Sequence, residues 1–391
     1  MNVAVNKGVR LLEILRRRQS EMMELLTSMV KAESPSHDFE SQIPVQEMIS
    51  ESLTDCDFEV KKFQANDAGG QLLALPKKRV KGQPVQMMLG HCDTVWPIGT
   101  LEKMPIHLTD GKLHGPGVYD MKAGLVQAIF AVKAIRELGE TPSVTPYFFI
   151  NSDEEIGSAK SKQNIFRLAK ASDRVFVMEP GLGPTGKLKT ARKGVGRFTV
   201  KVIGKASHAG LAPEQGVSAI LELSHVVQAL FALNNPEKGI TVNVGTIDGG
   251  MRPNVVAPEA SAVVDVRVVT HEDAREIEQA IEGLRPVVPG TRLEITGRVG
   301  RPPMEKTPGN QRIWEHAQEA ADEMEISIED GLAGGGSDGN FTSLHCPTLD
   351  GMGAVGDGAH ALTEFVFVDK MPERAALLAR LLLLPELRPG L

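Results

Sequence analysis

Several histidine and carboxylate side chains of this chain directly follow apolar stretches, and these residue types can bind metal ions or transfer protons. The stretch VQMMLG is followed by HCDTV, which puts His91 and Asp93 at the end of a run typical of a buried strand. Alternate side chains of a strand share one face, so these two are predicted to point the same way. The residues in this kind of context are His91, Asp93, Asp120, Glu154, Glu155, Glu179 and His360.

Each of these residues also has an ordinary structural interpretation. His91 could be a core histidine paired with Asp93, and Asp120 could cap the helix that follows it. Glu154 and Glu155 could lie in a solvated loop, and the later positions could be turn or loop residues.

The positions are better explained together than one by one. Parallel strands end at the same edge of a sheet, so side chains that follow several such strands meet there. Carboxylates packed together repel one another unless cations compensate them. Two imidazoles and three carboxylates, one of them bridging, suit a pair of zinc ions that each keep an open position for water.

The surrounding sequence predicts the sheet that would hold this site. Apolar runs at 85–90, 144–152 and 174–180 alternate with a helical pattern at 123–138. This alternation is typical of an α/β fold with a mostly parallel sheet and helices on its faces. An amphipathic pattern before Ser34 predicts one long helix or two broken ones at the start of the chain.

The pattern changes near Gly194. Alternating strands and two helical stretches follow in the order strand, helix, strand, strand, helix, strand, which is typical of a ferredoxin-like α+β sandwich. We therefore predict a discontinuous catalytic zinc-binding domain, residues 1–193 and 303–391, and an inserted lid or dimerisation domain at 194–302.

The amino-acid composition excludes some classes of binding partner and indicates a cellular compartment. The 391 residues carry a formal net charge of −7, which offers no attraction for nucleic acid or anionic lipid. No apolar run is long enough to span a membrane. The three cysteines are far apart, which fits a reducing compartment, and the N-terminus lacks the apolar core of a signal peptide. We expect a cytoplasmic protein.

The motifs GHCDTV, GPGVYDMKAG, NSDEEIGS, MEP, GKASHAG and GAH occur in that order. They resemble those of the co-catalytic zinc metallopeptidases that include glutamate carboxypeptidase, aminoacylase, acetylornithine deacetylase and succinyl-diaminopimelate desuccinylase. The stretches RPNVVAP and GRPP add to the similarity to glutamate carboxypeptidase.

The resemblance implies a role for each metal-ligating position. Asp120 would bridge two zinc ions, for which manganese or cobalt could substitute. Glu155 and His360 would complete the site of one ion, and His91 and Glu179 that of the other.

The resemblance also implies the catalytic residues. Glu154 would be the general base that takes a proton from the attacking water and passes it to the leaving amine. Asp93 would hydrogen-bond the second ring nitrogen of His91 and fix its tautomer. His208, in GKASHAG, would donate to the oxyanion that develops on the scissile carbonyl, commonly across a dimer interface.

Further residues would hold the substrate. Asn254 and Arg267 resemble the groups with which the family grips the free carboxylate, although Arg267 could equally be an ordinary arginine on a strand face. Gly335 and Gly336 lie in GGGSDGN, which resembles a glycine-rich substrate loop.

The predicted activity is hydrolysis of an amide bond with release of an amino acid that has a free carboxylate, as in a glutamate carboxypeptidase. The alternative is an N-acyl amino-acid deacylase that removes acetyl or succinyl groups, and a non-catalytic binding protein of the same fold is a third hypothesis. The expected partners are a small peptide or N-acyl amino-acid substrate and a second copy of the chain, joined through the inserted domain.

Overall fold

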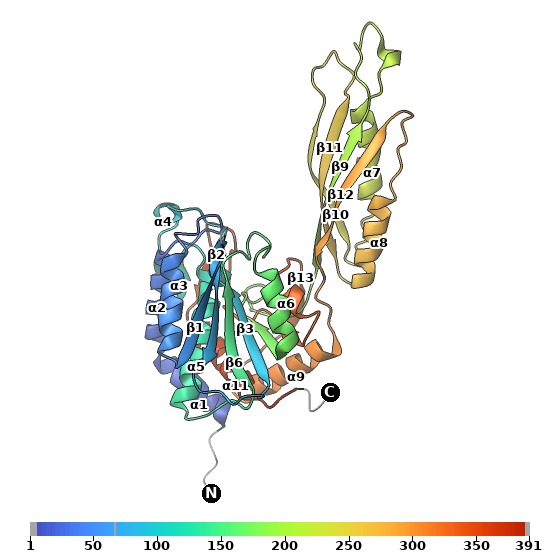
Figure 1. Cartoon of the computed structure of the whole chain (residues 1–391). Coiled ribbons are helices and arrows are strands. Elements are labelled where there is room, and N and C mark those ends of the chain that lie inside the picture. The colour runs from blue at the N-terminus through green and yellow to red at the C-terminus, as the bar shows by residue number, and fades with distance from the viewer. Residues whose placement is uncertain (1–5, 66–67, 388–391) are drawn as a thin grey trace. The chain divides into compact units, whose positions relative to one another are not determined.

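The computed structural model describes residues 6–65 and 68–387, and Figure 1 shows the course of the chain. The described residues divide into two compact units. The first contains the residues up to Thr190, together with Lys306–Leu332 and the part from Ser337 onward. The second contains Ala191–Glu305 and Ala333–Gly336.

A six-stranded sheet forms the centre of the first unit. Its strands in spatial order are β1 (Phe58–Ala65), β2 (Ala68–Pro76), β6 (Thr145–Asn151), β3 (Val85–His91), β7 (Ser172–Val177) and β14 (Thr348–Leu349). The last four are parallel to one another, whereas β2 is antiparallel to both β1 and β6. The predicted α/β fold with a mostly parallel sheet is confirmed.

Helices cover both faces of this sheet. They are α1 (Lys7–Arg17), α2 (Gln19–Lys31), α3 (Ile43–Thr54), α5 (Ala123–Glu137), α6 (Lys162–Ala171), α9 (Pro308–Asp322), α10 (Gly339–Thr342) and α11 (Lys370–Leu382). Met88 of β3 belongs to a core with α1, α5 and α11, whereas its neighbours Met87 and Leu89 pack with α6. Burial on both faces explains why the strand reads as a continuous apolar run.

The second unit has the predicted order of elements. They are β9 (Gly194–Ile203), α7 (Ala219–Phe231), β10 (Thr241–Gly249), β11 (Glu259–Val268), α8 (His271–Glu282) and β12 (Arg292–Arg301). The four strands form an antiparallel sheet in the order β10-β11-β9-β12, the arrangement of a ferredoxin-like sandwich. Its core contains Phe198, Val264 and Ile281 and is separate from those of the first unit.

Smaller elements complete the chain. They are α4 (Thr100–Lys103), β4 (His107–Thr109), β5 (Lys112–His114), the turn η1 (Val118–Lys122), β8 (Leu188–Arg192), the turn η2 (Pro213–Gln215), β13 (Asp330–Ala333), β15 (Gly356–Asp357) and β16 (Phe365–Phe367). Strands β15, β16, β5 and β4 form a second sheet, and β13 pairs with β8. Among the described helices, none is long and apolar enough to cross a membrane.

Candidate metal centre and active site

Three neighbouring parallel strands supply the first part of the site. Strand β3 ends at His91, β6 ends at Asn151 just before Glu154 and Glu155, and β7 ends at Val177 just before Glu179. His91 lies opposite Asn151 in the register of β3 and β6. The parallel register therefore brings three chain segments that are distant in sequence to one edge of the sheet.

Asp120 lies between two histidines. Its Oδ1 is 3.3 Å from Nε2 of His91, and its Oδ2 is 3.5 Å from Nε2 of His360. Each histidine has a second carboxylate beside the same nitrogen: Glu179 is 3.5 Å from His91, and Glu155 is 3.2 Å from His360. The ligand atoms thus form two groups that share Asp120, and each group could hold a metal ion.

Asp120 and His360 lie at uncommon backbone positions. Asp120 lies in η1, and the peptide bond between Asp120 and Met121 is cis. His360 lies between β15 and β16 with a φ of 61°, in the left-handed region that non-glycine residues rarely adopt.

Several ligand atoms are buried without a hydrogen bond. Nε2 of His91, Oδ1 of Asp120 and Oε1 of Glu155 have no hydrogen-bond partner. Buried polar atoms are normally satisfied, because leaving them unpaired costs about 1–3 kcal/mol each. Cations bound in the two groups would satisfy these atoms, so the residues fit metal ions.

The electrostatics point the same way. Burial acts to lower the pKa of His91, but the neighbouring carboxylates of Asp120, Asp93 and Glu179 outweigh it and hold that pKa well above its ordinary value. Hydrogen bonds to Asp120 and Glu155 raise the pKa of His360 to about 10. The carboxylates of the cluster therefore favour positive charge beside them, which a metal cation supplies when bound.

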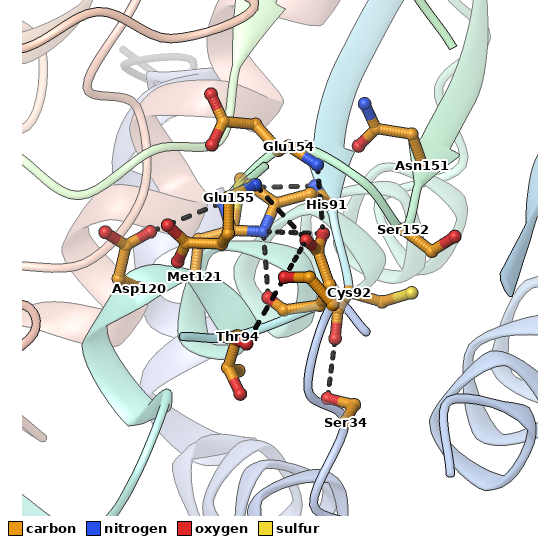
Figure 2. Close-up of polar contacts among 12 residues, drawn as sticks. Ser34, His91, Cys92, Thr94, Asp120, Met121, Asn151, Ser152, Glu154 and Glu155 are labelled. Atoms are coloured by element: carbon orange, nitrogen blue, oxygen red, sulfur yellow. Dashed lines mark hydrogen bonds and ion pairs between the residues drawn. The ribbon is translucent and has the colours of Figure 1, made fainter. Parts of the chain in front are cut away.

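Asp93 accepts hydrogen bonds from the loop of Glu154 and Glu155, which Figure 2 shows together with His91. Its Oδ1 accepts a hydrogen bond from the amide of Glu154 at 3.3 Å, and its Oδ2 accepts from the amide of Glu155 at 3.2 Å. Ser36 donates to Oδ2 at 2.7 Å. Ser36 was not among the predicted site residues, because it follows the N-terminal helical pattern and carries no other local signal.

The contact between Asp93 and His91 differs in detail from the expectation. Nδ1 of His91 lies 3.0 Å from the carbonyl oxygen of Asp93 and 3.4 Å from its carboxylate. Strand β3 ends at His91, so Asp93 lies in the turn after the strand. The contact therefore comes from that turn and not from the alternation of side chains along a strand. A proton on Nδ1 leaves Nε2 available as a metal ligand.

Cys92, between these two residues in the sequence, is a buried thiol.

Glu154 lies in a tightly held turn after β6. Its carbonyl oxygen accepts from the amide of Gly157 at 2.8 Å, and Asp153 accepts from the amide of Lys160 at 2.8 Å. The side chain of Glu154 belongs to neither of the two metal-binding groups. Its predicted role as the general base is therefore separate from metal binding.

The remaining predicted residues lie in the second unit. Nδ1 of His208 accepts from the amides of Gly210 at 3.2 Å and Leu211 at 3.1 Å. Asn254 lies beside this loop, because its carbonyl oxygen accepts from the amide of Ala209 at 3.0 Å. Both side chains are exposed.

Arg267 and the glycine loop have partners within the same unit. Arg267 forms a bidentate ion pair with Asp265, at 2.8 and 3.0 Å, which supports its alternative interpretation as a strand-face arginine. Gly335 accepts a hydrogen bond from Arg192 at 3.2 Å. The structure groups Gly335 and Gly336 with the second unit, although the expected domain limits put them in the catalytic part.

A parallel α/β sheet whose strand ends present two metal-binding groups with a shared aspartate is typical of metal-dependent hydrolases. The sequence model of peptidase family M20/M25/M40 matches residues 87–384, so the chain belongs to this family of metallopeptidases and related hydrolases.

Individual relatives agree with this assignment. The chain is 27% identical to carboxypeptidase G2 from Pseudomonas sp. over 373 residues, which cover 93% of this chain and 89% of that protein. It is 28% identical to succinyl-diaminopimelate desuccinylase from Delftia acidovorans, over 73% of this chain and 78% of that protein. The crystal structure of aminopeptidase PepT from Bacillus cereus has the same fold, with a TM-score of 0.78 at 22% identity, over 93% of this chain and 98% of that one.

Proposed function

We propose that the protein is a two-zinc hydrolase that cleaves an amide bond and releases an amino acid with a free carboxylate. The observation that carries this proposal is the position of Asp120, whose two oxygens face His91 and His360 separately. Carboxypeptidase G2 and succinyl-diaminopimelate desuccinylase are among the relatives, and both names describe the removal of one part of a small molecule.

The residues divide between two ions. His91 and Glu179 would hold one and Glu155 and His360 the other, with Asp120 shared. Imidazole nitrogen and carboxylate oxygen suit zinc, and manganese or cobalt could replace it. When bound, the ions polarise the scissile carbonyl and lower the pKa of water.

Glu154 would move the proton. Its carboxylate takes a proton from the attacking water and then gives it to the nitrogen of the leaving amine, so the residue ends the cycle as it began. The two hydrogen bonds from the amides of Glu154 and Glu155 to Asp93 hold this loop in place.

His208 is suited to donate to an oxyanion. Because its Nδ1 accepts two amide hydrogen bonds, the neutral ring carries its proton on Nε2. A fixed Nε2–H group that faces solvent can stabilise the negative charge that develops on a carbonyl oxygen.

Asn254 remains a proposed contact for the substrate carboxylate, and Gly335 and Gly336 remain proposed parts of a substrate-binding loop. Arg267 already uses Nε and Nη2 in its pair with Asp265, so only part of its guanidinium is available to a substrate. The alternative activity, removal of an acetyl or succinyl group from an amino acid, uses the same metal site and is supported by the desuccinylase relative.

A second copy of the chain is the proposed protein partner. Strand β10 is an edge strand of its sheet, so one row of its main-chain groups has no neighbouring strand. Large apolar side chains are exposed on α7, on β10 and just after β10. They are Ile220, Leu221, Phe231, Ile247 and Met251. Pairing of two β10 edges would cover both features in a symmetric dimer.

The three cysteines are buried thiols, which supports the reducing compartment, the cytoplasm, expected from the sequence.

Substitution of Glu154 by Gln tests the proposed function. Without the carboxylate, turnover should fall at least about 100-fold, because general base catalysis contributes that much. Metal content, measured by mass spectrometry, should stay at two equivalents. Glu155→Gln is the contrasting variant and should lose metal as well as activity, since Glu155 is a proposed ligand.

Substrates for this test come from a panel of N-acyl glutamates, dipeptides and acetylated or succinylated amino acids. Turnover of peptidyl or acyl glutamates would support the carboxypeptidase, and turnover of acetyl or succinyl compounds alone would favour the deacylase. Near-parental activity of Glu154→Gln would contradict its assignment as the base.

A further inference from the structure

Glu364 is a buried carboxylate that the proposed mechanism does not use. It lies four residues after His360 and is 0% exposed. Its Oε1 accepts hydrogen bonds from the amides of Tyr119 at 2.8 Å and Asp120 at 3.0 Å. Its Oε2 accepts from the amide of Gly117 at 2.9 Å and from the indole nitrogen of Trp96 at 2.8 Å.

Three of these four donors are main-chain amides of the loop that carries Asp120. Buried amides need acceptors, and Glu364 supplies the acceptor for all three. The loop is also packed closely, since Gly117 has a φ of 71° and an added Cβ would lie 2.5 Å from Thr94. The main chain of Asp120 is thus held by a carboxylate that is 244 positions away in the sequence.

The same carboxylate connects three segments that each contain a proposed metal ligand. Trp96 belongs to the segment of His91, the amides belong to that of Asp120, and Glu364 belongs to that of His360. This last segment has two successive turns, closed by main-chain hydrogen bonds of 2.9 Å from the amide of Ala361 to Gly358 and 3.0 Å from the amide of Glu364 to Ala361.

We propose that Glu364 is a positioning residue for the metal centre, which holds the Asp120 loop so that the carboxylate of Asp120 can face both metal sites. This inference rests on the proposed function, because it assumes that Asp120 is shared by two ions. Groups that orient metal ligands in this way commonly contribute about 10- to 100-fold to metal affinity.

The role requires a carboxylate of this length. Each oxygen accepts from two donors, so the amide of a glutamine would turn its NH₂ group toward two N–H donors. Glu364→Gln should therefore release part of the loop. Because Asp120 is shared, we expect both metal equivalents to bind at least about 10-fold more weakly.

Glu222 is a matched control in the second unit. It is also 0% exposed, and its carboxylate accepts from the amides of Val287 and Val288 and from the hydroxyl of Thr291. Glu222→Gln removes a similar buried acceptor and should lower stability without changing metal affinity.

The experiment is a titration of metal-free protein with Zn²⁺ in the presence of a competing chromophoric chelator, with the Co²⁺ absorption spectrum as a second readout. Weaker binding of both equivalents and a changed Co²⁺ spectrum in Glu364→Gln, with neither change in Glu222→Gln, would support the proposal. Parental affinity and an unchanged spectrum in Glu364→Gln would overturn it, and so would equal losses in the two variants.

Trp96→Phe keeps the test decisive if Glu364→Gln does not fold, because it removes only one of the four donors. A smaller loss of affinity for both ions supports the proposal, and unchanged affinity overturns it. The parent protein separates the two hypotheses. If it binds no metal after reconstitution, the proposed function fails. If parent and variants bind two ions with the same affinity, only the role of Glu364 is refuted.

Discussion

Asp93 shows at the residue scale how one side chain can control several groups of the site. Its oxygens accept from the amides of Glu154 and Glu155 and from the hydroxyl of Ser36, and its carbonyl oxygen faces His91. The proposed proton transfer by Glu154 and the proposed metal ligation by His91 and Glu155 therefore both depend on the orientation of Asp93. Asp93 itself does neither.

We expect Asp93→Asn to lower kcat roughly 10- to 100-fold, because its amide NH₂ would replace an acceptor of main-chain N–H groups. The unpaired amide should also lower the free energy of unfolding by about 1–3 kcal/mol. Steady-state kinetics and urea unfolding measure the two effects. Ser36→Ala, which removes a single donor, should have a smaller effect on both, and parental kcat in Asp93→Asn would refute the role.

At the scale of elements, the site depends on how closely α5 approaches the end of β7. A Cβ atom added to Gly124 would lie 2.0 Å from the carbonyl oxygen of Met178, and one added to Gly353 would lie 2.2 Å from the same oxygen. The main chain that leads into Glu179 is thus enclosed on two sides, and glycine is required because any side chain would displace it.

Gly124→Ala should therefore move Glu179. Overpacking of this kind costs about 1–3 kcal/mol of stability, which urea unfolding would reveal. Since Glu179 belongs to only one metal group, we expect weaker binding of one equivalent in a Zn²⁺ titration. A control is Gly245→Ala, whose added Cβ would meet only the side chain of Asn243, at 3.6 Å. Weaker binding of both zinc equivalents, or unchanged binding of both, would contradict this assignment.

At the scale of the whole molecule, the proposed dimer depends on the β10 edge. Ile247 is 60% exposed on that strand, and a lysine there should discourage pairing of two edges. We expect the parent to have the mass of a dimer by size exclusion with light scattering and Ile247→Lys to shift toward the monomer.

Val80→Lys is the control, because Val80 is 72% exposed and belongs to the first unit, so its substitution should leave the dimer intact. A parent that is monomeric at every concentration would refute the dimer. It would also require His208 to act within its own chain.

The sequence by itself determined the α/β class, the ferredoxin-like order of the second unit and the residues that gather at the sheet edge. These features follow from local periodicity and from the rule that parallel strands end at one edge, so that His91, Glu155 and Glu179 had to be neighbours. The family resemblance then implied that Asp120 is the shared ligand and that His360 belongs to the site of one ion.

Only the tertiary structure decided which polar groups hold the site together. Glu364 and Asp120 are 244 positions apart, and Ser36 and Asp93 are 57 apart, so no local pattern connects them. The pair of Arg267 with Asp265 likewise depends on side-chain conformation, since a strand-face arginine and a substrate-binding one have the same sequence context. Contacts of this kind arise when separate segments pack, because a buried carboxylate must find its donors wherever the fold places them.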